Sequence, residues 1–218
     1  MKLTAAILVL SFCGPVLAQD PWKNIYSQHA WAERDKWQKA DVLIRLLDVA
    51  SGSTVADIGC HEGYMTFKLA KIVGDRGVVY AVDVVEAKLE KVEKRARESR
   101  LTQVKTIKGD YDNPRLPLNV LDGAIILDTY HEMDDHEEVL QHLKNSLKPG
   151  GHLVICEPIS DSRRELSREA QEGKHELAMA YALADLKKAG FKIVYQKDSF
   201  IDRTREKGDK MWIVVAKK

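Results

Sequence analysis

A glycine-containing loop, residues 57–63 (DIGCHEG), follows a short β-branched run in this chain of 218 residues. Gly59 and Gly63 let the backbone approach a ligand closely and turn into the helix that follows. Asp83 ends the next apolar run, where a carboxylate can accept both hydroxyls of a ribose. This order of residues predicts a binding site for a cofactor that contains adenosine.

The loop lacks the GxGxxG pattern of a dinucleotide site. It resembles instead the first motif of the class I S-adenosylmethionine-dependent methyltransferases, in which an acidic and an apolar residue precede GxGxG. Gly109-Asp110 stands where that family contacts adenine, and residues 147–151 (LKPGG) resemble a family hallmark. The resemblance covers residues 54–157 and implies S-adenosylmethionine as the cofactor. It implies that the cofactor is bound by Asp57, Gly59, Cys60, His61, Gly63, Asp83, Asp110, Tyr111 and Asp128.

His61 departs from the family pattern, because it occupies the position of the middle glycine. Its imidazole is expected either to help bind the methionine carboxylate of the cofactor or to point into solvent. A side chain at this position leaves open a non-catalytic module that binds S-adenosylmethionine or S-adenosylhomocysteine. A nicotinamide-dependent oxidoreductase fits less well, because it normally carries the GxGxxG loop.

Further segments resemble small predicted exported or periplasmic bacterial methyltransferases, which are similar to quinone-biosynthesis methyltransferases in the cofactor half. These segments are residues 34–38 (RDKWQ), 128–133 (DTYHEM), 202–204 (DRT) and 207–212 (KGDKMW). The resemblance implies methyl transfer to a small-molecule acceptor. The position after the fourth predicted strand also lacks the Asn/Asp-Pro-Pro pattern of enzymes that methylate amino groups of nucleic acids.

The methyl acceptor is expected just beyond this strand, beside Asp128, Tyr130 and His131. His131 is the candidate general base, because an imidazole with a pKa of about 6.5 takes up a proton near neutral pH. An orienting or packing role is the alternative for His131, and Tyr130 is the second catalytic candidate. Trp37 and His175 are the candidates for binding the substrate.

Histidines and acidic residues also gather between His131 and His142, which raises the question of a metal. Their HExxxH spacing is not the HExxH spacing of a helical zinc site, so we expect no metal ligand. Cys60 and Cys156 are expected to be small buried residues without a disulfide, because another strand should separate theirs.

Alternating strand and helix patterns predict an α/β fold that positions these residues. The predicted strands are 54–59, 78–83, 104–109, 121–129, 152–157, 191–195 and 211–216. The predicted helices are 64–73, 86–99, 137–147 and 173–189, with His175 and Glu176 opening the last. We expect a Rossmann-like, doubly wound, mostly parallel seven-stranded sheet with an antiparallel last strand and helices on both faces.

Residues 1–18 combine a basic start, a mostly apolar run and a final small residue, which is the pattern of a secretory signal peptide. We expect cleavage after Ala18, a periplasmic or secreted protein, and no membrane span once the signal is removed.

Residues 19–50 are expected to form an N-terminal aromatic lid and a helix that ends near Ala50. The aromatic side chains of this segment are expected either to cover the pocket or to pack in the core. They are Trp22, Tyr26, Trp31 and Trp37. The class I methyltransferase domain is expected over residues 51–218.

The charge balance argues against nucleic acid as a partner. The chain has 34 Lys and Arg against 33 Asp and Glu, a net charge of +1, without the basic excess that phosphate binding usually needs. With 44% hydrophobic and 31% charged residues, the composition excludes wholesale disorder and a polytopic membrane protein.

Overall fold

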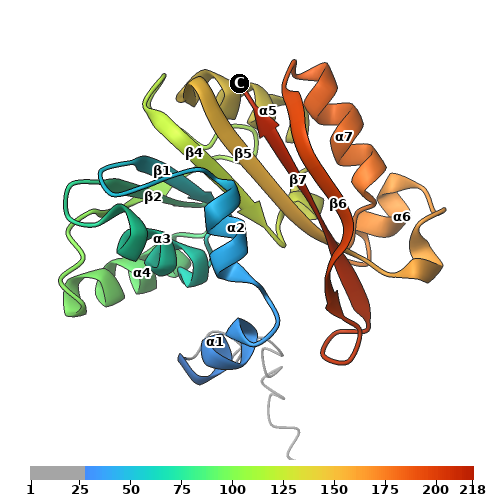
Figure 1. The fold of residues 1–218 in the computed structure, drawn as a ribbon, viewed down its shortest axis with the longest axis horizontal. Helices are drawn as coiled ribbons and strands as arrows, with labels where there is room; N and C mark the ends of the chain where they lie inside the picture. The colour runs from blue at the N-terminus through green and yellow to red at the C-terminus, as the bar shows by residue number, and fades with distance from the viewer. Residues whose placement is uncertain (1–27) are drawn as a thin grey trace, which may run out of the picture.

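A seven-stranded sheet in the order β3-β2-β1-β4-β5-β7-β6 forms the centre of the fold (Figure 1). The computed structural model describes residues 28–218, so the predicted signal segment, Trp22 and Tyr26 lie outside the described residues. Neighbouring strands are parallel from β3 to β5, whereas β7 runs antiparallel between β5 and β6. The predicted fold class is confirmed. The strands are β1 (Thr54–Ile58), β2 (Val78–Asp83), β3 (Val104–Lys108), β4 (Leu121–Leu127), β5 (Leu147–Ile159), β6 (Lys192–Arg203) and β7 (Asp209–Lys217).

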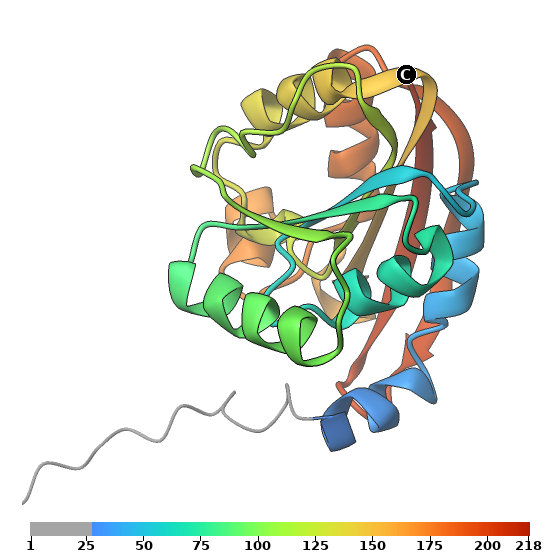
Figure 2. The same cartoon turned by 90° about the vertical axis from the view of Figure 1, so that its left-hand side faces the viewer.

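Helices cover both faces of this sheet, as the side view in Figure 2 shows. One face carries α2 (Ala40–Leu46), α3 (Tyr64–Val73) and α4 (Glu86–Glu98). The other face carries α5 (His136–Ser146) and α7 (Met179–Lys188). The shorter elements are α1 (Gln28–Asp35), α6 (Arg168–Glu172) and the 3₁₀ turns η1 (Tyr130–Glu132) and η2 (Asp161–Arg163). Within the described residues, no helix combines the length and apolar character that a membrane crossing needs.

The alternation of side chains along each strand decides which core they join. In β4, Ile125 packs with residues of α2 and α3, whereas its neighbour Ile126 packs with residues of α5 and α7. Both isoleucines are fully buried, and each burial stabilises the fold by about 1.5–3 kcal/mol relative to an exposed side chain. The apolar run at residues 124–127 of β4 therefore reflects a strand covered on both faces.

The hairpin of β6 and β7 is longer than the sequence predicts. The predicted strands end at residue 195 and begin again at residue 211, but β6 continues to Arg203 and β7 begins at Asp209, so that Asp202 pairs with Lys210 and Arg203 pairs with Asp209. Only residues 204–208 make the turn. Charged side chains at these positions obscure the strand pattern, and they reach the pocket described below.

The helix predicted at 173–189 is shorter than expected, because α7 begins at Met179. The buried amide of Gln171 holds the preceding segment in an irregular turn. Its side-chain nitrogen Nε2 donates to the carbonyls of Arg163, Arg164 and Leu166, and its Oε1 accepts from the amide of Ala178 at 2.7 Å. His175 and Glu176 therefore lie in a loop before α7 and not at the start of a helix.

Candidate active site

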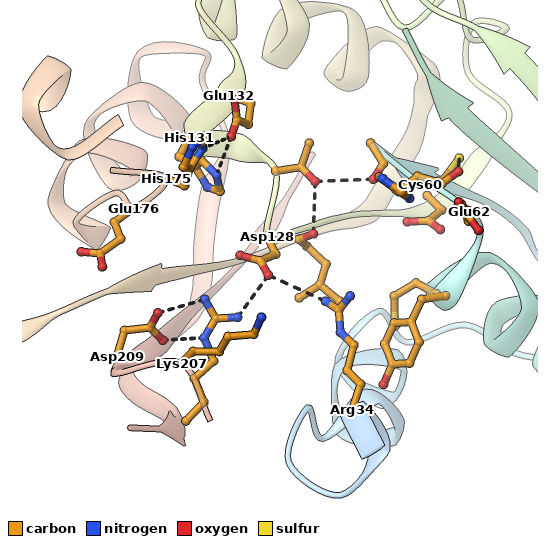
Figure 3. Close-up of a pocket in the computed structure, with 18 of the residues that line it drawn as sticks. Arg34, Cys60, Glu62, Asp128, His131, Glu132, His175, Glu176, Lys207 and Asp209 are labelled. Carbon is orange, nitrogen blue, oxygen red and sulfur yellow. Dashed lines mark hydrogen bonds and ion pairs between the residues drawn. The ribbon is translucent and has the colours of Figure 1, made fainter. Parts of the chain in front are cut away.

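Two adjoining cavities open at the carboxyl ends of β1, β2 and β4, where parallel sheets bind ligands. The larger one, of about 950 Å³, is shown in Figure 3. The smaller one, of about 250 Å³, has mostly apolar walls. Both cavities are lined by Gly59, Asp83, Thr129 and Glu132, so they meet at the glycine loop.

Most predicted site residues line one of these cavities. Those in the larger cavity are Trp37, Asp57, Gly59, Cys60, His61, Asp83, Asp128, His131 and His175. Those in the smaller cavity include Gly59, Asp83, Asp110 and Tyr111. Gly63 and Tyr130 are among the lining residues of neither.

The glycine loop has a left-handed backbone at Gly59 and Gly63, a conformation that favours glycine. Gly59 has a φ of +68°, and a Cβ at this position would lie 2.2 Å from Cγ2 of Thr129. Gly63 caps the start of α3 with a φ of +94°. His61, which replaces the middle glycine of the family motif, also has a left-handed backbone, with a φ of +49°.

His61 itself lines the larger cavity. Burial lowers the pKa of its imidazole to about 4, and the positive charge of Lys88 adds to this effect. The ring is therefore neutral at physiological pH. His61 can meet a ligand carboxylate through a hydrogen bond but not through a full positive charge.

Asp83 fixes the same loop through its carboxylate. Oδ2 accepts a hydrogen bond from the backbone amide of His61 at 2.8 Å, and Oδ1 accepts one from Val85 at 2.9 Å. A carboxylate has about four lone-pair sites, so both oxygens can still accept bonds from a ligand. Asp83 thus joins the end of β2 to the glycine loop at the meeting point of the two cavities.

Asp57 lies at the floor of the larger cavity with 3% of its surface exposed. Its Oδ2 accepts a hydrogen bond from Thr66 Oγ1 at 2.6 Å. Burial raises its pKa to about 6, although the Thr66 hydroxyl opposes this shift. A positive charge in the adjoining cavity would stabilise the ionised carboxylate.

Asp110 and Tyr111 border the smaller cavity after β3. The carboxylate of Asp110 pairs with Nε of Arg115 at 2.6 Å, and the Tyr111 side chain is largely exposed. Apolar side chains from the ends of β1 and β2 and from the segments after β3 and β4 line this cavity, among them Ile58, Val82, Pro114 and Met133. The cavity offers flat apolar walls with a polar rim.

Asp128 follows β4 and lies between two guanidinium groups at the centre of Figure 3. Its Oδ2 is 3.1 Å from Nη1 of Arg203 and 4.0 Å from Nη2 of Arg34. Burial alone would raise the pKa of Asp128, but the charges of Arg203 and Arg34 lower it below its usual range. Arg203 also pairs with the Asp209 carboxylate through two hydrogen bonds.

The aromatic residues of the N-terminal segment play two different roles. Trp37 lines the larger cavity, with the Arg203 guanidinium 5.7 Å from its ring centre. Trp31 packs against Tyr64 and Phe67 of α3 at ring distances of 6.0 and 5.9 Å. In the described residues, both tryptophans pack against the core, and Trp37 also lines the pocket.

Glu157, which the sequence motifs do not single out, holds the turn after β4. This residue of β5 is 0% exposed, and its carboxylate accepts the backbone amides of Thr129 at 2.7 Å and Tyr130 at 2.9 Å. It also contacts Nδ1 of His131 at 2.5 Å. A glutamate in an otherwise apolar strand that ends at the pocket is the sequence feature that could have predicted this role.

Tyr130, the second catalytic candidate, is not among the residues that line either cavity. Tyr130 is 0% exposed within the core, and its hydroxyl donates to Asp185 of α7 at 2.9 Å. Burial and the Asp185 carboxylate raise the pKa of its phenol. The 3₁₀ turn η1 directs Tyr130 into the core, whereas the next two residues face the cavity.

The candidate role of His131 as a general base rests on an imidazole pKa of about 6.5, and its surroundings change this value. Burial would lower its pKa, but the charge of Glu157 and hydrogen bonds to Glu132 and Glu157 raise it to about 10. Both ring nitrogens face carboxylates, since Nε2 lies 3.1 Å from Glu132 Oε1. The orienting role, which was the alternative, fits this environment better.

His175 enters the larger cavity from the loop before α7. Its Nδ1 contacts the same oxygen, Oε1 of Glu132, that faces His131. Carboxylates and two imidazoles therefore meet on the side of the cavity away from Lys207 and Asp209, as Figure 3 shows.

The cysteines behave as predicted. Cys60 and Cys156 are both free and buried. They belong to the ends of β1 and β5, which β4 separates in the sheet. Burial raises the pKa of both thiols well above the usual value, so neither is an activated nucleophile.

A family model described as a methyltransferase domain matches residues 50–212. The chain belongs to the methyltransferase domain family. Among curated proteins, it is 32% identical over 122 residues to a demethylmenaquinone methyltransferase of Geobacillus sp. (strain WCH70). That match covers 56% of this chain and 51% of the relative, so the chain spans about half the length of the curated relatives it matches.

Solved methyltransferases share the fold at low sequence identity. A SAM-dependent methyltransferase from Aquifex aeolicus aligns with a TM-score of 0.70 and 22% identity, over 85% of this chain and 92% of that one. A phosphoethanolamine N-methyltransferase of Haemonchus contortus, solved with S-adenosyl-L-methionine, aligns with a TM-score of 0.67 and 14% identity. This alignment covers 90% of this chain and 58% of that one. These likenesses support the methyltransferase fold.

Proposed function

We propose that this methyltransferase-family chain transfers a methyl group from S-adenosylmethionine to a small-molecule acceptor. The observation that carries the proposal is the junction of an apolar cavity and a polar cavity at Gly59 and Asp83. S-Adenosylmethionine has the matching shape, since a flat apolar base and a charged amino-acid end flank its ribose. The family membership and the two solved methyltransferases named above, one described as SAM-dependent and one solved with S-adenosyl-L-methionine, support the same cofactor.

The residues of both cavities fit this cofactor. The smaller cavity would hold the adenine between apolar side chains such as Ile58 and Val82. Asp83 retains acceptor capacity for ribose hydroxyls beside its bonds to two backbone amides. Asp57 would face the positively charged end of the cofactor, whose charge compensates the burial of its carboxylate.

When bound, the cofactor supplies an electrophilic methyl group on a sulfonium. The protein's own contribution is to hold the acceptor in line with that methyl group and to exclude water, and such positioning can supply about 7–11 kcal/mol of the barrier. Trp37 and the Asp128 side chain, fixed by Arg203 and Arg34, form part of the rigid wall that would do so. The acceptor would enter on the side of His131 and His175.

Calorimetry on the full chain tests this proposal directly. We expect saturable binding of S-adenosylmethionine and S-adenosylhomocysteine, with NADH as a negative control. Asp83→Ala should abolish binding, whereas Asp75→Asn should leave it intact because Asp75 lies exposed in the turn between α3 and β2. No binding of either nucleoside at millimolar concentration would refute the proposal.

A second measurement separates an enzyme from a binding module. Acceptor candidates are screened for release of S-adenosylhomocysteine by the wild-type chain. Release with any acceptor, lost in Asp83→Ala, supports methyl transfer. Tight cofactor binding without release for a broad acceptor panel would favour the non-catalytic module.

The proposed site of action is outside the cytoplasm. This part of the proposal is supported by the signal-like pattern of residues 1–18, which lie outside the described residues. Expression in a bacterial host followed by fractionation tests it. We expect mass spectrometry of the exported chain to give an N-terminus at Gln19, and full-length protein confined to the cytoplasm would contradict it.

A further inference from the structure

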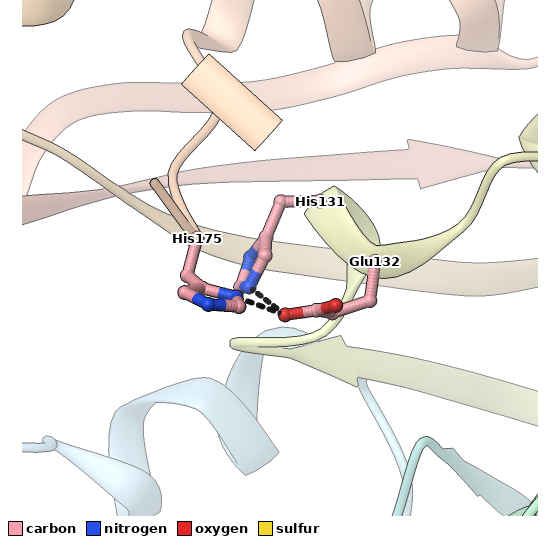
Figure 4. Close-up of side chains that lie close together, drawn as sticks. All are labelled: His131, Glu132 and His175. Carbon is pink, nitrogen blue, oxygen red and sulfur yellow. Dashed lines mark hydrogen bonds and ion pairs between the residues drawn. The ribbon is translucent and has the colours of Figure 1, made fainter. Parts of the chain in front are cut away.

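Two histidines and a glutamate converge at one edge of the larger cavity (Figure 4). Nε2 of His131 lies 3.1 Å from Oε1 of Glu132, and Nδ1 of His175 contacts the same oxygen. The ligand atoms of the three side chains all lie within 4.8 Å of one another. The two imidazole rings are 5.8 Å apart and inclined by 75°, so they approach the carboxylate from different directions.

The distance of 3.1 Å between Nε2 of His131 and Oε1 of Glu132 is close to the edge of a tetrahedral metal site. Bonds of about 2.0–2.1 Å to zinc place neighbouring ligand atoms about 3.3 Å apart. The set of two imidazoles and one carboxylate is one that zinc uses in catalytic sites, with a further position open to a ligand. We propose that His131, Glu132 and His175 bind a divalent zinc ion whose open coordination position faces the cavity.

The surroundings of His131 support this assignment independently of the three ligands. Metal-binding histidines usually pair their second ring nitrogen with a carboxylate, which fixes the tautomer and the ring orientation. Nδ1 of His131 has such a partner in Glu157, at 2.5 Å, and Glu157 is fully buried. The amides of Thr129 and Tyr130 hold that glutamate in place. His131 thus presents Nε2 to the cluster from a rigid support.

The three ligands come from two walls of the cavity. His131 and Glu132 belong to the turn η1 after β4, and His175 belongs to the loop that Gln171 organises before α7. The side chains of Glu132 and His175 are 54% and 68% exposed, so an ion can reach them from solvent. Zinc would join these two walls and order the side of the cavity where the acceptor enters.

A metal here would also define the class of acceptor, and this consequence rests on the proposed function. A hydroxyl oxygen bound in the open position would have a lowered pKa, as zinc-bound water does. Its O–H bond would break, with the proton passing to water and the electron pair staying on oxygen. That pair would form the new O–CH3 bond as the S–CH3 bond of the sulfonium breaks, and the S–C electron pair would remain on the sulfur of S-adenosylhomocysteine. The acceptor class is therefore an alcohol or phenol that binds zinc through its oxygen.

Zinc binding to the full chain, expressed without an affinity tag and stripped with a chelator, tests the site without any cofactor. We expect calorimetry to give one zinc per chain and cobalt to give visible absorption bands of a bound ion. His175→Ala and Glu132→Gln should each abolish this binding. The matched controls His142→Ala and Glu138→Gln should not change it, because both residues lie on α5, outside the cluster.

Glu157→Gln adds a test of orientation, with an expected loss of about 10- to 100-fold in zinc affinity. His175 is exposed, so its variant should fold, and circular dichroism checks this. Absence of saturable zinc binding by the folded wild type, or equal binding by His175→Ala, would overturn the assignment. Cofactor binding measured in chelator reports separately on the proposed function, so that either inference can fail alone.

Discussion

Asp57→Asn should make the protein more stable and its cofactor site weaker. The buried carboxyl has a pKa raised from 3.8 to about 6, which means that the folded state resists its ionisation. At 1.36 kcal/mol for each tenfold change in proton affinity, ionised Asp57 costs the fold about 3 kcal/mol at neutral pH. Asparagine keeps an oxygen for the Thr66 hydroxyl and removes that cost.

The pH dependence of this effect follows from the direction of the shift. A carboxyl whose pKa is raised in the folded state costs nothing well below 3.8, and the cost grows as pH rises to about 6. The variant should therefore exceed the wild type by about 1 kcal/mol near pH 4.5 and by about 3 kcal/mol near pH 7.5. In a domain of this size, the latter corresponds to about 6–12 °C in melting temperature.

Urea denaturation at the two pH values gives these differences, with Asp75→Asn as the exposed control. Calorimetry should show S-adenosylmethionine binding weakened by about 10- to 100-fold in Asp57→Asn, because a charged hydrogen-bond partner is lost. The reasoning is refuted if the variant is no more stable than wild type near pH 7.5, or if its advantage does not change with pH.

Three further substitutions probe other contacts. Gly59→Ala should destabilise the fold by about 2–4 kcal/mol in urea denaturation, because a methyl group adds both backbone strain and a steric clash. Tyr130→Phe removes one hydrogen bond to Asp185 and should cost about 1 kcal/mol while leaving methyl transfer intact; a lost turnover with normal stability would restore a catalytic role. Asp209→Ala breaks the buried pair with Arg203 and should cost about 3 kcal/mol, an expectation that an unchanged melting temperature would contradict.

The sequence predicts the sheet and the cofactor side of the pocket well, for a physical reason. Parallel strands covered on both faces must be mostly apolar, as in residues 124–127 of β4, and their carboxyl ends must meet at one edge. Asp57 and Asp83 are read correctly as pocket residues because each stands at such an end. For these two residues, the sequence pattern that predicts the strand also predicts the position of the side chain at the pocket.

The acceptor side is less predictable, since irregular segments set it. In η1, neighbouring residues point in opposite directions, so Tyr130 enters the core while His131 faces the cavity. His175 depends on a turn held by the buried Gln171, which no periodicity reveals. His131 lies beside His175 and not beside His136 because the tertiary fold brings two distant segments together. The HExxxH spacing could not predict this contact.

The position of β7 has a consequence for when the protein can fold. This last strand of the chain is not at an edge but between β5 and β6, and it carries Asp209, the partner of Arg203 at the pocket. During synthesis, β6 leaves the ribosome before the strand that links it to the sheet exists. Until β7 has been synthesised, β6 lacks its hydrogen-bonding partner and the sheet cannot be completed. Such late completion of the sheet is compatible with the proposed export, in which a chain crosses the membrane before it folds.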